Sequence, residues 1–445
     1  MRTCVLHVGM AKTGSTSIQA TLAALPPSAG FVFLQHGEAN AARALSAAFM
    51  SDAERYRPNR KRGHDAQQLQ RKGRQALARF SQSLSDDVRM AVLSSEMIPG
   101  FDHDTLVAMR DWLRQRFDRI RVLAYVREPA GYMESMAQQS LKNGNGEIDL
   151  ERRYPDYRGH FEPLEQVFGR EAIEYRLFEP AALHQGCVVR DFAREIGLSL
   201  SEDAVVRVNE GLSRRAVALL LIYRQRFPRF GHGPHAMRRN RALVRWLSGL
   251  SGPKLRLSPT LLRPVIEAHA EDLAWISARL DAPLAPRYAE ESPDQLRQVE
   301  ELLQLDPTTL DWLQRQTGEA PRHHPDGRLR LGWVARLMQR HVEGLLPEPQ
   351  DAADDAAEDR QATEGEGLPE DKFDAAGMLE HLQAEGVVET HAKADWLPHL
   401  QRLLQQLALR LRDADGPVEV PGCGTFQVRA SGAGVWRAPR AKEMP

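Results

Sequence analysis

A short glycine-containing stretch near the start of the chain, HVGMAKTGSTSIQ at positions 7–19, has the composition of an anion-binding loop. An apolar, β-rich run, TCVLHV, precedes it, and a run with helical spacing, STSIQATLAAL, follows it. A glycine loop between a strand and a helix gathers backbone N–H groups around an anion, and the helix N-terminus adds about half a positive charge. The polar residues available there are Lys12, Thr13, Ser15, Thr16 and Ser17.

The position of the lysine bears on which anion is bound. The phosphate loop of ATP-using enzymes reads G-x-x-x-x-G-K-[ST]. Gly9 and Gly14 have that spacing and Thr16 holds the hydroxyl position, but Ser15 stands where the lysine belongs, and Lys12 lies between the glycines. A strand that ends in an aspartate would help to hold Mg²⁺, but the neighbouring strand here ends VLSSE. Both departures argue against an ATP site.

A second stretch, VLAYVREPAGYMESMAQQ, carries an arginine at the end of another predicted strand. Pro129 stops that strand and releases the chain into a helix. Ser135 follows Arg127 by eight residues, one to two turns into the helix.

Together the two stretches resemble the sulfotransferases that use 3′-phosphoadenosine-5′-phosphosulfate as donor. In that family the lysine lies inside the loop and is followed by the pattern found at residues 12–16, and an arginine and a serine share the spacing of Arg127 and Ser135. The resemblance covers roughly residues 1–280, most securely 5–19 and 120–140.

The resemblance implies a role for each residue of the two stretches. Lys12 would stand near the bridging oxygen, where negative charge develops during transfer. Residues 13–17, with the Gly14 amide, would hold the 5′-phosphate, and Arg127 and Ser135 would hold the 3′-phosphate. The implied activity moves a sulfuryl group from the donor to a hydroxyl of a carbohydrate or small molecule, with no metal expected.

The acceptor hydroxyl needs a general base within reach. Glu96 ends the strand VLSSE beside the loop and is the first candidate, and His36 in FLQHGEAN is a rival. His7, on the first strand, is better interpreted as structural. Two other interpretations stay open: Glu96 caps a helix, or Arg127 serves as an ion-pair partner of Glu96 or Glu128.

The elements that must position these residues indicate an α/β fold. Four apolar runs predict strands, and helical patterns separate them; the runs are residues 3–8, 88–96, 120–128 and 172–179. This alternation predicts a P-loop-type parallel sheet flanked by helices, with ligands at the carboxyl ends of the strands. Gly9, Glu96 and Arg127 are therefore expected to lie close together.

The rest of the chain predicts further organisation. We expect one domain over 1–346, with an α/β core to about 210 and a helical region over about 211–346. An acidic disordered linker is predicted over 347–372, because residues 350–372 hold nine acids and two bases. Residues 373–445 predict a small α+β module of two helices and a β-hairpin. This module loosely resembles the small bacterial histone-like DNA-binding proteins, but the basic DNA-binding arm is missing or short, so DNA binding, dimerisation and docking all stay open.

Bulk composition limits the remaining possibilities. The chain has 445 residues, a net charge of −1 and three widely spaced cysteines, which argues against a disulfide framework. It has no run of about 18 apolar residues and no signal segment, so we expect a cytoplasmic protein.

Residues 224–263 hold ten bases and no acid. They form either a solvated face or a surface that attracts an anionic acceptor such as an acidic glycan. A P-loop kinase and a non-catalytic nucleotide-binding scaffold with a partner- or DNA-binding tail are the alternative functions.

Overall fold

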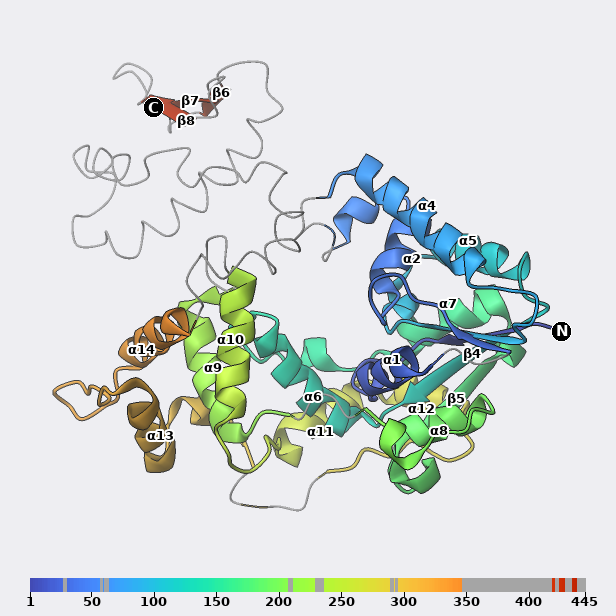
Figure 1. The fold of residues 1–445 in the computed structure, drawn as a ribbon. Coiled ribbons are helices and arrows are strands. Elements are labelled where there is room, and N and C mark those ends of the chain that lie inside the picture. Colours follow the sequence, from blue (N-terminus) through green and yellow to red (C-terminus); the bar gives the residue numbers. More distant parts are fainter. Residues whose placement is uncertain are drawn as a thin grey trace. The chain divides into compact units, whose positions relative to one another are not determined.

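The computed structural model describes two compact units, Met1–Glu358 and Asp359–Pro445, and each is treated by itself (Figure 1). The described residues are 1–26, 30–56, 59, 64–206, 211–228, 236–288, 292, 295–345, 418–420, 424–428 and 434–437. No helix in these ranges is both long and apolar enough to cross a bilayer.

A five-stranded parallel sheet forms the core of the first unit, in the order β2-β3-β1-β4-β5; β4 and β5 are labelled in Figure 1. The strands are β1 Thr3–His7, β2 Phe31–Phe33, β3 Met90–Ser94, β4 Arg119–Val126 and β5 Ile173–Leu177. β1, β3 and β5 lie within the predicted runs and β4 begins one residue before its run, so the α/β parallel-sheet prediction is confirmed. The strand β2 was missed, since three residues are too short to show a pattern. Because β1 pairs with β3 on one side and β4 on the other, their carboxyl ends meet.

Helices cover both faces of this sheet. On one face, Val5 and Leu123 pack with Ile18 of α1 (Ser15–Ala24) and Phe192 of α8 (Val188–Glu195). On the other face, alternate strand residues such as Leu6 pack with further helices. These are α2 Ala42–Phe49, α4 Ala66–Gln82, α5 His103–Arg114 and α7 Tyr157–Phe168. Burial on both faces accounts for the nearly continuous apolar runs of the strands.

A helical half follows the sheet, as predicted, and α6 (Pro129–Lys142) packs against it through α9. Its helices are α9 Arg214–Arg226, α10 Ala236–Ser248, α11 Pro259–Ala268, α12 Ala270–Ser277, α13 Pro307–Thr317 and α14 Leu331–Gly344. Arg224 is fully buried there, although it belongs to the basic stretch that was interpreted as surface.

The second unit contains a three-stranded antiparallel sheet in the order β6-β7-β8. The expected hairpin corresponds to β6 (Val418–Val420) and β7 (Gly424–Val428), and β8 (Gly434–Arg437) adds a third strand. The predicted linker over 347–372 and the two predicted helices after it lie outside the described residues.

Candidate functional site

The glycine loop joins β1 to α1 and depends on both of its glycines. Gly14 has φ +81° and caps α1, and a Cβ added to it would lie 2.7 Å from Cγ1 of Val188 at the start of α8. Gly9 has φ +89°, and its added Cβ would lie 3.0 Å from the Cβ of Glu96. Only glycine adopts these conformations with so little space, so the loop backbone passes directly against α8 on one side and Glu96 on the other.

Several backbone amides of the glycine loop have no hydrogen-bond acceptor within the described residues. Within the described chain, the N–H groups of Lys12, Gly14, Ser15 and Thr16 donate to no acceptor. Ser15 is 2% exposed, so its amide is buried without a partner. Buried N–H groups are nearly always hydrogen-bonded, and a bound anion at this helix N-terminus would satisfy them.

The loop hydroxyls are arranged differently from one another. Thr13 Oγ1 donates to the Met10 carbonyl at 2.6 Å, and Ser15 Oγ approaches the same carbonyl at 3.3 Å. Both side chains are buried, and their bonds to Met10 stabilise the loop backbone. Thr16 is exposed in the first turn of α1, and Ser17 donates its N–H to the Gly14 carbonyl at 2.9 Å. Their contacts with a phosphate stay a prediction.

Arg127 reaches the loop from the end of β4. Its Nη1 donates to the Lys12 carbonyl at 3.0 Å, and its own carbonyl accepts from Tyr157 Oη at 2.6 Å. Burial lowers the pKa of the guanidinium. Within the described residues, no carboxylate forms an ion pair with Arg127, so the two ion-pair interpretations do not describe it. Glu128 instead caps α6, since its carboxylate accepts from the N–H groups of Ala130 and Gly131 at 2.9 and 2.6 Å.

Ser135 lies half-buried on α6, and the residue before it is tied to the basic stretch. Glu134 accepts from Arg256 Nη1 at 2.7 Å and from the Leu257 N–H at 2.9 Å. The positive charge of Arg256 also acts on Arg127. The structure therefore brings a second arginine to the neighbourhood of the predicted 3′-phosphate residues.

The Lys12 side chain crosses to α6, where its Nζ donates to Gln139 Oε1 at 3.2 Å. Burial lowers the pKa of Lys12; the Glu96 carboxylate opposes this shift, and the Arg127 guanidinium adds to it. The charges of Glu96 and Arg127 thus both act on Lys12, which agrees with the expectation that these strand ends lie close together.

Glu96 lies in the turn after β3, directly after Ser95, whose N–H donates to the His7 carbonyl of β1 at 2.9 Å. Burial raises the pKa of Glu96, and Lys12 opposes the shift. Burial also raises the pKa of Tyr56 and of Tyr132 to about 12, and the negative charge of Glu96 contributes in both cases. A carboxylate whose pKa is raised by burial can accept a proton from a nearby hydroxyl.

The two histidine candidates lie in different surroundings. His7 is fully buried, its Nδ1 lies 2.8 Å from Ser94 Oγ, and burial lowers its pKa to about 3. It is a core residue, as its strand position indicated. His36 is exposed in the segment after β2, and no contact within the described chain joins it to Lys12 or Glu96.

Sequence reasoning missed Gln139, Tyr56 and the proximity of Tyr132 to Glu96. Gln139 follows Ser135 by four residues and therefore shares its helix face, a signal that was available. Tyr56 had no such signal, because it comes from the 3₁₀ turn Ala53–Arg55 after α2.

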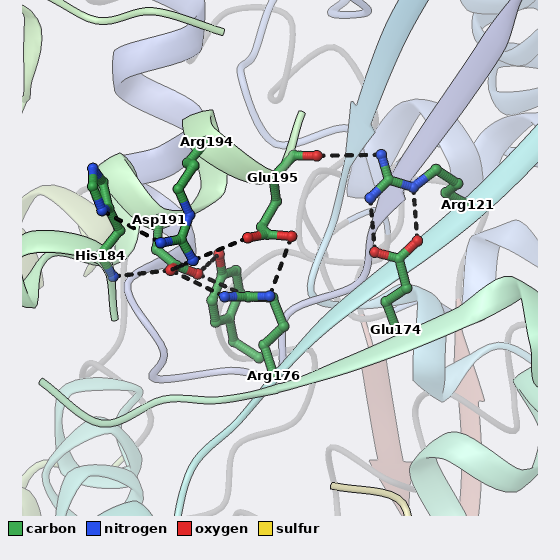
Figure 2. A network of polar contacts seen from close by, with 8 residues as sticks. Arg121, Glu174, Arg176, His184, Asp191, Arg194 and Glu195 are labelled. Carbon is green, nitrogen blue, oxygen red and sulfur yellow. Dashed lines mark hydrogen bonds and ion pairs between the residues drawn. The ribbon is translucent and has the colours of Figure 1, made fainter. Parts of the chain in front are cut away.

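A polar network behind the loop fixes α8 (Figure 2). The fully buried Asp191 accepts from Tyr125 Oη at 2.8 Å, from Arg176 Nε at 2.8 Å and from the His184 N–H at 2.9 Å. Figure 2 shows that Arg121 pairs with Glu174 across β4 and β5 and also donates to the Glu195 carbonyl, at 3.2 Å, which joins this pair to the network. Val188, the first residue of α8, packs against Gly14. The network therefore fixes the helix that lies against the glycine loop.

Comparisons with known proteins add little. No family model and no curated protein matches this chain. Among solved structures, a crystal structure of a sulfotransferase from Alicyclobacillus acidocaldarius matches at 16% identity and a TM-score of 0.31. The match covers 55% of this chain and 96% of that chain. A similarity this low carries no argument about activity.

Proposed function

We propose that the first unit is a sulfotransferase that moves a sulfuryl group from 3′-phosphoadenosine-5′-phosphosulfate to a hydroxyl of a carbohydrate or small-molecule acceptor. The observation that carries the proposal is the 3.0 Å hydrogen bond from Arg127 to the Lys12 carbonyl. It links the two stretches on which the family resemblance rests, 115 residues apart in the chain. An ATP loop would need a lysine where Ser15 stands.

The donor would bind along this edge of the sheet. The unsatisfied amides of Gly14, Ser15 and Thr16 would receive the 5′-phosphate. Arg127 and Ser135 would receive the 3′-phosphate, which distinguishes this donor from other adenine nucleotides. A hydrogen bond to a charged group contributes about 1.5–3 kcal/mol, so the 3′-phosphate should raise affinity by about tenfold or more.

The transfer step assigns one role to each remaining group. The acceptor oxygen attacks sulfur, the bond from sulfur to the bridging oxygen breaks, and the electron pair stays on the 5′-phosphate. Lys12 stabilises the charge that develops on that oxygen. Glu96 takes the acceptor's hydroxyl proton, and its raised pKa suits a base that works nearer neutral pH. The products are a sulfate ester and adenosine 3′,5′-bisphosphate.

Two measurements test this proposal. Isothermal titration calorimetry should show that adenosine 3′,5′-bisphosphate binds more tightly than adenosine 5′-monophosphate. Preferential, Mg²⁺-dependent binding of ATP would overturn the proposal in favour of a kinase. A screen of sugar and phenol acceptors with radiolabelled donor should then yield a labelled ester. Tight bisphosphate binding without transfer to water or to any acceptor would indicate a non-catalytic scaffold.

A further inference from the structure

The last turn of α6 faces the glycine loop and carries a lysine with no assigned role. Gln139 on this helix contacts Lys12 Nζ at 3.2 Å. Lys142 follows Gln139 by three residues, so the two side chains share one side of the helix. Lys142 is half-buried, and its ammonium makes no ion pair and no hydrogen bond within the described chain.

A buried clamp holds this turn from behind. Arg224, which is 0% exposed, donates from Nε to the Leu141 carbonyl at 2.9 Å and from Nη2 to Asn240 Oδ1. Asn240 Nδ2 in turn donates to the Lys142 carbonyl at 3.3 Å. These bonds satisfy carbonyls that the end of a helix leaves unpaired. These bonds fix the backbone of Lys142, whereas its ammonium makes no hydrogen bond within the described residues.

The surroundings of Lys142 are positively charged. Burial lowers the pKa of Lys142, and the positive charge of Lys12 lowers it further. Two ammonium groups that repel each other in a half-buried place are stabilised by an anion between them. The Glu96 carboxylate acts on Lys12 and opposes the lowering of its pKa.

We infer that Lys12 and Lys142 together form a two-ammonium site for one oxyanion of the sulfonate or carboxylate class. Two sources supply that chemistry: the transferable sulfuryl group of the donor, or an acidic group on the acceptor. The identity of these sources rests on the proposed function, whereas the site itself rests on the contacts of α6 with the loop and with Arg224.

Inorganic sulfate is the probe, and the full-length chain is used throughout. Sulfate is titrated calorimetrically, at constant ionic strength, into protein saturated with adenosine 3′,5′-bisphosphate, so that the phosphate positions are filled. We compare the wild type with Lys142→Gln, Lys142→Arg and the control Lys254→Gln, which changes an exposed lysine of the helical half. Removing a charged hydrogen bond should weaken sulfate binding about tenfold or more in Lys142→Gln. Lys142→Arg should restore most of it, and Lys254→Gln should change nothing.

The outcomes separate the sources and the alternatives. If Lys142→Gln also weakens binding of the intact donor, the oxyanion is the sulfuryl group; if donor affinity is unchanged, it is an acidic group of the acceptor. Unchanged sulfate binding in Lys142→Gln overturns the inference, even if its melting temperature falls, because Lys142 would then only stabilise the end of α6. If the wild type does not bind the bisphosphate, the proposed function fails, and Lys142-dependent binding of sulfate to the free protein still tests the site.

Discussion

Gly14→Ala tests whether the loop is held against α8 as described. The substitution places a methyl group at φ +81°, 2.7 Å from Cγ1 of Val188. Val188 cannot retreat easily, because α8 is tied to the sheet by the buried Asp191. The perturbation therefore combines backbone strain with a steric overlap against a fixed neighbour.

The two contributions can be separated by a matched control. A non-glycine residue in the left-handed region costs about 1–2 kcal/mol, and overpacking adds about 1–3 kcal/mol. Gly37 has φ +73° but nothing within 4 Å of an added Cβ, so Gly37→Ala shows the strain alone. We expect Gly14→Ala to lower the free energy of unfolding by about 2–5 kcal/mol, and Gly37→Ala by the strain term only.

Urea unfolding of the full chain, followed by the fluorescence of its tryptophans, measures both variants. The double variant Gly14→Ala with Val188→Ala should recover most of the excess loss, since it removes the atom in the overlap. Equal losses of unfolding free energy in the two single variants, or no recovery in the double variant, would show that α8 does not pack tightly against Gly14.

Three further outcomes follow from the site. Glu96→Gln should lower the transfer rate by about 10²–10⁴-fold with bisphosphate affinity kept, whereas His36→Ala should leave the rate nearly unchanged; equal effects in radiolabel assays would contradict the assignment of the base. Because the pKa of Glu96 is raised above the ordinary 4.5, the wild-type rate should fall as pH drops through that raised value, and a rate flat down to pH 4.5 would exclude Glu96. Asp191→Ala should destabilise the fold by about 1–3 kcal/mol in urea unfolding at pH 7, since Tyr125 Oη and the His184 N–H lose their acceptor while Arg176 keeps its ion pair with Glu195. Burial alone would raise the pKa of Asp191, but the hydrogen bonds outweigh it and leave the pKa lowered. Its stabilisation is therefore present above about pH 4 and lost as pH falls through the lowered pKa, so the variant should lose this acid dependence.

Local patterns were enough to predict the sheet and the meeting of its strand ends. The apolar runs before Gly9, Glu96 and Arg127 are long enough to show burial on both faces. Parallel pairing then brings their ends together without any knowledge of side-chain contacts. The bond between Arg127 and the Lys12 carbonyl agrees with that expectation.

The contacts made by the helical half could not be predicted in the same way. Arg224 occurs among ten bases in forty residues, a composition typical of solvent-facing surface, yet it is fully buried against α6. Its partners are residues 83 positions before it and 16 after it in the chain, and no local pattern signals such pairs. The same holds for Lys142, whose role depends on which face of α6 the loop meets.

We propose that Arg127 binds a 3′-phosphate beside the glycine loop. The ratio of the affinities for a nucleotide with and without that phosphate tests this most directly. Calorimetry compares adenosine 3′,5′-bisphosphate with adenosine 5′-monophosphate in the wild type, in Arg127→Ala, and in Arg226→Ala as a control at an exposed arginine of α9. We predict a preference for the bisphosphate of about tenfold or more in the wild type and in Arg226→Ala, and a ratio near one in Arg127→Ala. Equal affinities in the wild type, or an undiminished ratio in Arg127→Ala, would contradict the account.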